Sequence, residues 1–383
     1  MRLRRHALTL VVIVAMLGVA LLSAFPALAD TPLTEKERFG VAFVGRVWQG
    51  KTSVPQSLAD YAVAPLKIGW YSNWTFGAIP QQPADDTLEY VQVIGVRDSL
   101  WPPDWDEVRN AVMLNQSALW IIGNEPECPN QGDLTPTEYA QRYHESYIRI
   151  KGWDPTAQVA IGGVVEPTPL RLRWIEEAMA AYENAYGEPM PVDVWNIHMQ
   201  ILHEGTEENH KSGAGVPTGI TPAPGEARDY SYPDCANARI FKTLVRDFRQ
   251  WMADHGQRNK PLIISEMGVL QPSYLLYPDP KMSEEQRTEM GDRLIEQYMW
   301  QTFDWLLNYC RDPEIGYAAD DNRLVQRWLW YSLNDGIYDE QTNPRGFNGS
   351  LFDNKTKALT RFGETFVAFR NQTYRLAVPV VSR

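Results

Sequence analysis

Two glutamates stand at the ends of short apolar runs, where their carboxyl groups could take part in acid–base or nucleophilic chemistry. Glu125 follows the run ALWIIGN, and Glu266 follows LIIS. Burying a carboxyl group beside an apolar core is costly unless the group is hydrogen-bonded or shares a proton. Either glutamate alone could instead be an ion-paired member of a polar layer in the core. If the two face each other, one can donate a proton while the other acts as a nucleophile.

Other polar and aromatic residues lie at the ends of similar apolar runs. Asn124 directly precedes Glu125, His198 and Gln200 follow the run VDVWNI, and Trp330 lies within RWLWYS. These residues can act at one site only if the fold brings the ends of their runs together, so the elements that carry them have to be identified.

Eight short runs rich in β-branched and aromatic residues are predicted to be strands. They are residues 39–45, 66–71, 90–96, 118–123, 158–165, 192–198, 262–266 and 327–332. Helical patterns alternate with most of them, which is typical of βα units around a parallel sheet. An open doubly wound sheet should carry a Gly-rich phosphate turn after its first strand, and GRVWQGKTS is not such a turn. We therefore predict an α/β fold, a single (β/α)8 TIM barrel with a long loop after strand six.

Helix-capping patterns support this assignment. Asp104 is expected to cap one helix, and Thr135, followed by Pro136 and Glu138, is expected to cap the next. Further helices are expected at residues 169–186, 236–255, 283–309 and 359–369. The first two βα units show only short or irregular helical patterns.

The predicted barrel would bring the two glutamates together. The carboxyl ends of barrel strands carry the active site in TIM-barrel enzymes. Glu125 ends strand four and Glu266 ends strand seven, and these strands lie nearly opposite each other in an eight-stranded ring. Their carboxyl groups are therefore expected to converge across the mouth, where repulsion raises the pKa of one of them.

The ordered motifs resemble glycoside hydrolase clan A, a superfamily of TIM barrels with catalytic glutamates on strands four and seven. The resemblance rests on IIGNEP, LIISEMG and WLWYS, together with LFDNKTKALT before the last helix. It spans residues 38 to 370. A retaining mechanism with two glutamates, in which a glycosyl-enzyme forms and is then hydrolysed, is what this resemblance implies.

The resemblance also implies roles for individual residues. Glu125 would be the acid/base, and Glu266 would be the nucleophile. Asn124 would hydrogen-bond the sugar 2-hydroxyl, and His198 would lie near the nucleophile. Trp330 would form the floor of the −1 subsite by stacking on the sugar.

The chain departs from the clan pattern in two places. Strand two is followed by YSNW, without the Arg that many members carry there, and Gln200 stands where members often have an aromatic residue. Trp48 and Trp74 are further candidates for sugar binding, although ordinary core packing is the alternative for any single Trp.

The termini and the charge bear on location and partners. Residues 1–29 have a basic start, a long apolar run and an Ala-Leu-Ala site, which is typical of a cleaved signal peptide. An uncleaved membrane anchor is the alternative. We expect the barrel to occupy residues 30–373 and a short tail to occupy residues 374–383. The formal net charge of −12 argues against a nucleic-acid partner.

The long segment 199–234 is expected to be a lid or cleft wall. It contains His203, Glu204 and His210, but their irregular spacing is not that of a metal site, and we predict no metal and no cofactor. Of the three cysteines, Cys128 and Cys235 are both expected on the catalytic face, so a Cys128–Cys235 disulfide is possible in an exported protein.

The sequence therefore predicts a secreted, monomeric retaining glycoside hydrolase acting on a polysaccharide or oligosaccharide. It would be extracellular or held at the cell surface, with no membrane contact after signal cleavage. A transglycosylase would use the same residues. A catalytically inactive carbohydrate-binding or scaffold barrel would need the aromatic residues but not the pair of glutamates. A metal-dependent hydrolase would need more His and Asp at the strand ends than His198 alone.

Overall fold

Eight parallel strands form the centre of the computed structural model, which describes residues 32–49, 52–77, 82–205, 213–336 and 346–372. They are β1 (Phe39–Ala42), β4 (Trp70–Ser72), β5 (Glu89–Ile94), β6 (Leu119–Asn124), β7 (Gln158–Gly163), β8 (Trp195–Met199), β9 (Leu262–Met267) and β10 (Arg327–Trp330). The predicted leader and tail lie outside the described residues.

The strands close into a ring, as predicted. Their order is β7-β6-β5-β4-β1-β10-β9-β8, and the end strands β7 and β8 meet through the isolated bridges Ala160–Val194 and Val164–Ile197. All eight predicted strands are present. Strand β4 begins at Trp70 rather than at residue 66, because Ala64–Leu66 forms a 3-10 turn that includes Pro65.

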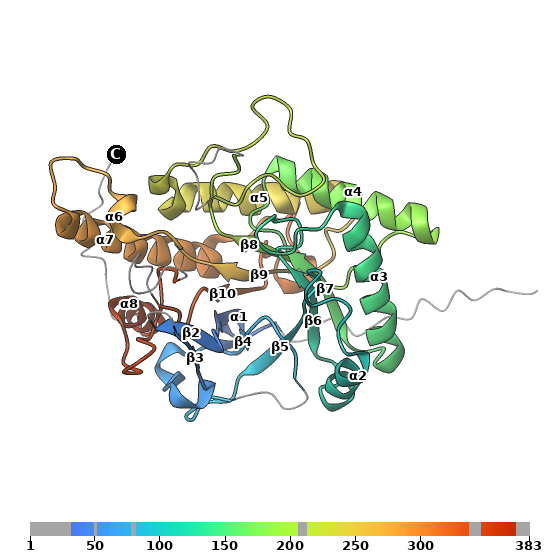
Figure 1. Ribbon diagram of the computed structural model, residues 1–383, viewed down its shortest axis with the longest axis horizontal. Helices are drawn as coiled ribbons and strands as arrows, with labels where there is room; N and C mark the ends of the chain where they lie inside the picture. Colours follow the sequence, from blue (N-terminus) through green and yellow to red (C-terminus); the bar gives the residue numbers. More distant parts are fainter. Residues whose placement is uncertain (1–31, 50–51, 78–81, 206–212, 337–345, 373–383) are drawn as a thin grey trace, which may run out of the picture. The chain divides into compact units, whose positions relative to one another are not determined.

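The helices pack around this ring (Figure 1). They are α1 (Glu35–Arg38), α2 (Trp105–Leu114), α3 (Pro136–Trp153), α4 (Pro169–Tyr186), α5 (Ala238–Asp254), α6 (Ser273–Leu276), α7 (Glu284–Asp304) and α8 (Arg361–Arg370). The predicted caps are confirmed, because the Asp104 side chain accepts from two backbone N–H groups and Thr135 forms a capping box with Glu138. Helix α7 continues as one π-helical segment, Trp305–Tyr309.

The first βα unit contains a hairpin instead of a helix. Strands β2 (Arg46–Gln49) and β3 (Thr52–Pro55) pair antiparallel after β1, and a short 3-10 turn at Leu58–Asp60 follows. This hairpin was not predicted from the sequence.

Two layers of apolar side chains alternate along the strands. One buried cluster consists of strand residues such as Val91, Ile121, Ile263 and Tyr331, which fill the inside of the barrel. A larger cluster lies between the strands and the helices, and it contains Trp330. Because successive side chains on a strand point to opposite faces, neighbouring residues of β10 serve different layers.

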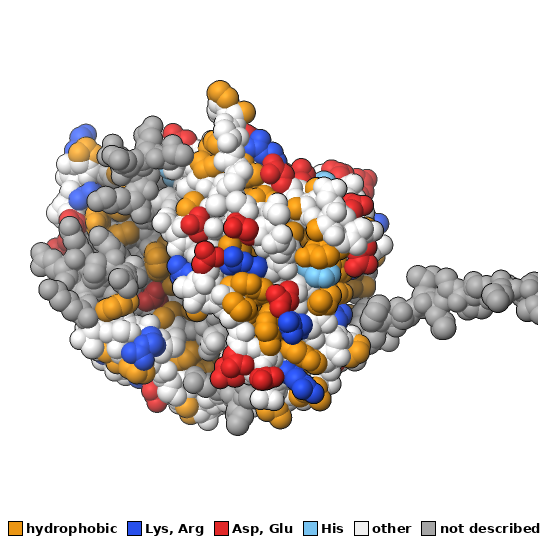
Figure 2. Space-filling model, turned by 45° about the vertical axis from the view of Figure 1, so that its right-hand side comes forward, with side chains coloured by type: hydrophobic (Ala, Val, Ile, Leu, Met, Phe, Trp, Pro, Cys, Tyr) orange, Lys and Arg blue, Asp and Glu red, His pale blue; other side chains and the backbone are white. Residues whose placement is uncertain are grey.

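The outer surface mixes side chains of all kinds. Figure 2 shows acidic, basic and hydrophobic side chains interspersed over one face. Within the described residues, no helix combines the length and the apolar character that crossing a bilayer requires.

Candidate active site

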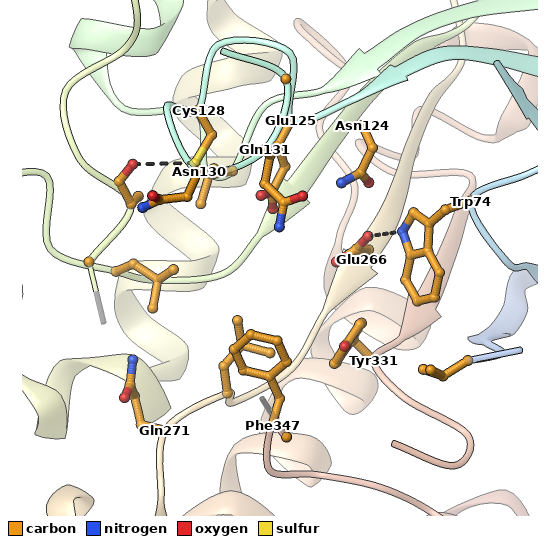
Figure 3. Close-up of a pocket in the computed structure, with 18 of the residues that line it drawn as sticks. Trp74, Asn124, Glu125, Cys128, Asn130, Gln131, Glu266, Gln271, Tyr331 and Phe347 are labelled. Carbon is orange, nitrogen blue, oxygen red and sulfur yellow. Dashed lines mark hydrogen bonds between the residues drawn. The ribbon is translucent and has the colours of Figure 1, made fainter. Parts of the chain in front are cut away.

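Glu125, His198 and Glu266 converge at the carboxyl ends of β6, β8 and β9. One side-chain oxygen or nitrogen atom of each lies within 4.8 Å of the others. The two glutamates line a cavity of about 1060 Å³ at the mouth of the barrel. Figure 3 shows Glu125 and Glu266 pointing into this cavity, with Trp74 and Tyr331 near Glu266 and Asn130 and Gln131 near Glu125. The predicted convergence across the barrel mouth is thus present in the structure.

Glu266 is buried and receives hydrogen bonds on both oxygens. The indole Nε1–H of Trp74 donates to Oε1, and the amide Nε2 of Gln200 donates to Oε2 at 3.4 Å. Burial raises the pKa of Glu266 to about 7, the neighbouring Glu125 carboxylate acts in the same direction, and His198 and the two donors oppose them. The site can therefore hold a carboxyl proton near neutral pH.

Glu125 lies in a sharp turn at the end of β6. Its φ is 41°, in the left-handed region, and its backbone N–H donates to the carbonyl of Gly163 at 3.0 Å. Its Oε1 lies 3.0 Å from Nδ1 of His198. A non-glycine residue with positive φ is uncommon and is often found where the backbone must aim a functional side chain.

His198 lies between the two glutamates rather than beside Glu266 alone. Its Nδ1 is 3.0 Å from Glu125 and 3.8 Å from Glu266. Burial alone lowers the pKa of His198, but the Glu266 and Glu125 carboxylates outweigh that effect and raise it. The imidazole is therefore poised to carry a positive charge between the two carboxyl groups.

Other predicted site residues also reach the cavity. Asn124 and Trp74 line it, and Gln200 is buried against Glu266. The structure brings them together with the glutamates, and their roles toward a sugar remain predictions.

The structure corrects the prediction for Trp330. Its side chain is fully buried between the barrel and the helices, where Nε1 donates to the carbonyl of Gly349 at 2.8 Å and the ring packs against Phe303. It does not line the cavity of the described residues. The next residue, Tyr331, faces the barrel interior and lines the cavity instead. Strand alternation in RWLWYS is the signal that could have identified it.

Trp48 is also misplaced by the prediction. It lies on β2 of the hairpin and is absent from the described residues that line the cavity. Phe347, which the sequence did not single out, lines the cavity, and its ring centroid is 5.9 Å from that of Tyr331. The Tyr331 hydroxyl donates to Asp335 at 2.8 Å, which fixes the ring in place.

The predicted Cys128–Cys235 disulfide is wrong. Both thiols are free and buried, as is that of Cys310. The Cys128 thiol contacts the carbonyl of Ala214 at 3.4 Å, whereas the Cys235 thiol contacts the carbonyl of Ser231 at 3.7 Å. The Cys128 thiol therefore packs against the segment after β8, whereas the Cys235 thiol packs within its own turn.

The long segment after β8 contributes to the cavity wall, and Leu202, Ala214 and Tyr232 line the cavity. His210 lies outside the described residues, and His203 pairs with Asp229 at 2.8 Å.

A buried arginine on α4 fastens this segment to the turn that carries Glu125. The guanidinium of Arg171 donates to Glu127 at 2.9 Å and also to Glu204. It further donates to the carbonyl of Gly215 at 3.1 Å. One charged group therefore connects the turn that carries Glu125 with the cavity wall.

Comparison with known proteins places this geometry in context. Residues 40–212 match the family described as Glycosyl hydrolase catalytic core. The predicted resemblance to the glycoside hydrolases is confirmed by this match. The matched segment includes Glu125 and His198 and ends before Glu266. No curated protein matches the chain in sequence.

Several solved structures of glycoside hydrolases are similar to this chain. A GH128 (subgroup II) endo-β-1,3-glucanase from Pseudomonas viridiflava aligns with a TM-score of 0.51 and 15% identity, over 86% of this chain and 97% of that chain. One from Sorangium cellulosum aligns with a TM-score of 0.46 and 16% identity, over 86% and 98%. A GH128 (subgroup III) curdlan-specific exo-β-1,3-glucanase from Blastomyces gilchristii gives 0.48 and 13%, over 86% and 97%. The first of these shows that the barrel fold is shared.

Proposed function

We propose that this protein is a retaining glycoside hydrolase that cleaves a β-1,3-glucan. The observation that carries the mechanism is the approach of Glu125 and Glu266, whose nearest oxygens lie within 4.8 Å of each other. Retaining glycosidases hold their carboxyl groups about 5–5.5 Å apart, whereas inverting enzymes need about 6.5–9.5 Å to admit a water molecule. The close approach favours direct attack by one carboxylate.

The two glutamates take different roles in this mechanism. Glu266, whose oxygens accept two N–H donors, attacks the anomeric carbon and forms a covalent glycosyl-enzyme. Glu125 gives its proton to the departing glycosidic oxygen as that bond breaks. Glu125 then removes a proton from a water molecule, which attacks the same carbon and releases Glu266.

The substrate class is supported by the structural neighbour of TM-score 0.51, which is an endo-β-1,3-glucanase. The aromatic rings of Trp74, Tyr331 and Phe347 line the cavity and suit the apolar faces of glucose units. The sequence of residues 1–29, which is typical of a signal peptide, supports export to such polymers, and we propose that the protein is secreted.

The first test is release of reducing ends from laminarin, curdlan and a β-1,4-glucan, with Glu125→Gln and Glu266→Gln beside the wild type. We expect cleavage of the β-1,3-glucans only, and a loss on the order of 10⁴-fold in kcat in both variants. NMR of the first product should show the β anomer. An α anomer would contradict retention, and cleavage by Glu266→Gln at the wild-type rate would contradict the assignment of the nucleophile.

The same assay separates the alternatives. Products longer than the substrate would indicate a transglycosylase, and equal glycan binding without cleavage by wild type and Glu266→Gln would indicate a binding barrel. Treatment with EDTA should leave the rate unchanged. A loss of activity that zinc restores would instead favour a metal held by Glu125, His198 and Glu266.

A further inference from the structure

We propose that Trp74 and Gln200 are positioning residues that hold the Glu266 carboxylate in its attacking orientation and make it, rather than Glu125, the nucleophile of the pair. This inference rests on the proposed function and identifies what distinguishes two carboxyl groups that share one cavity.

The hydrogen bonds of the two glutamates are asymmetric. Glu266 receives Trp74 Nε1–H on Oε1 and Gln200 Nε2–H on Oε2. For Glu125, the side-chain hydrogen bond found among the described residues is the one with His198. His198 approaches both carboxyl groups, so it cannot by itself decide which of them is ionised.

The chemistry of the donors makes this asymmetry effective. An indole N–H can donate but cannot accept, so Trp74 favours the charged form of the carboxylate it contacts. A donor on each oxygen also fixes the plane of the carboxylate, which sets the direction of its attacking lone pair. The two donors therefore oppose the protonation of Glu266 that its burial favours, and they stabilise the ionised form that the proposed first step needs.

The backbone of Trp74 supports a role beyond packing. Its φ is 58°, in the left-handed region that bulky side chains rarely adopt. The centroid of its ring lies 5.7 Å from that of Tyr331, and its indole N–H donates to Glu266. The fold thus maintains an unfavourable backbone conformation at the residue whose side chain contacts the nucleophile.

Gln200 supplies the second donor from another element. It is buried directly after β8, two residues beyond His198, where its amide nitrogen reaches Glu266. Because Trp74 follows β4 and Gln200 follows β8, the two donors approach Glu266 from separate strands and can be removed independently.

The test compares Trp74→Phe and Gln200→Leu with Trp48→Phe, a matched control outside the cavity. The pKa of Glu266 is measured by NMR titration of protein labelled with ¹³C at the glutamate carboxyl carbon. Its signal is assigned by its absence in Glu266→Gln. Removing a hydrogen bond to a charged group should raise the pKa of Glu266 by about one to two units. Trp48→Phe should leave it unchanged.

The pH dependence of kcat/KM should be measured on a nitrophenyl laminari-oligosaccharide. The midpoint on the acidic side of this profile should shift to higher pH by a similar amount in both variants. If the two residues had a purely structural role, the rate would fall but the midpoint pH on the acidic side of the profile would stay unchanged. If Trp74→Phe fails to fold, as judged by thermal unfolding, Gln200→Leu decides the matter. An unchanged or lowered pKa of Glu266 in the folded variants overturns the inference. The titration does not depend on turnover, so it tests the inference separately from the proposed function. A wild-type protein that cleaves no glycan would count against the proposed function alone.

Discussion

At the scale of single residues, Glu266 is held in an environment that opposes its charge. It is 6% exposed, and burial with the adjacent Glu125 raises its pKa to about 7, above the ordinary value of 4.5. Its folded-state pKa therefore exceeds its unfolded-state pKa. Such a group favours the folded protein at low pH, and that contribution is lost as the pH rises through the folded-state pKa.

Glu266→Gln should consequently stabilise the protein at alkaline pH. We expect the free energy of unfolding of the variant to match that of the wild type near pH 4 and to exceed it by up to about 3 kcal/mol at pH 8. Urea unfolding at both pH values measures this. Glu183→Gln on the exposed face of α4 is the control and should show no comparable change between the two pH values. A Glu266→Gln variant that is less stable than the wild type at pH 8 would contradict the prediction.

The residues that the sequence placed at the site share one property, since each directly ends or follows a barrel strand. Glu125, Glu266, His198 and Gln200 were found because the end of a parallel strand defines both position and face. Trp330 was misassigned because a resemblance identifies a motif but not which face of the strand each of its residues occupies. Phe347 lies in a loop without a regular period, so no pattern pointed to it.

At the scale of elements, the end of β7 determines where His198 can lie. A Cβ atom added at Gly163 would come within 2.3 Å of Cδ2 and 2.7 Å of Nε2 of His198. The imidazole is buried, so it has little room to move away. The absence of a side chain at Gly163 therefore permits the contact between His198 and Glu125.

Gly163→Ala should displace His198 and reduce kcat/KM on laminarin by roughly 10–100-fold, because small displacements of catalytic groups are costly. Gly152→Ala is the matched control: it lies near the end of α3, and its added Cβ would meet nothing within 4 Å. It should retain full activity and gain about 0.5–1 kcal/mol of stability from helix propensity. Full activity in Gly163→Ala would show that the imidazole position does not matter.

The elements found from sequence are those with strong local signals. Strands buried on both faces and helices with side-chain caps were predicted with small errors at their ends. The β2–β3 hairpin was missed because Arg46–Gln49 and Thr52–Pro55 are short and only partly buried, which leaves little hydrophobic pattern to read. Its place in the fold is set by contacts distant in sequence, such as the hydrogen bond from Gln49 to Asn354 at 3.3 Å.

At the scale of the whole molecule, no disulfide links the three cysteines. Burial raises the pKa of each thiol, Cys128, Cys235 and Cys310, to about 12. A buried thiol with a raised pKa is a poor nucleophile and reacts slowly.

A thiol titration should therefore find almost no reactive thiol in the native protein and three after unfolding in guanidinium. Dithiothreitol should leave the thermal midpoint unchanged. One free thiol after unfolding, together with a midpoint lowered by dithiothreitol, would show that a disulfide forms after all.

The ring of strands has one junction, between β7 and β8, that is made without a continuous ladder. Strands β8 and β9 pair along five residues each, whereas β7 and β8 and the residues beside them meet at two isolated bridges and at separate backbone hydrogen bonds, such as the one from His198 to Val164 at 2.8 Å. This junction lies between β6, which carries Glu125, and β9, which carries Glu266. The proposed glycan substrate, held by both glutamates, would therefore lie across this junction and connect two strands of the ring that no continuous ladder joins.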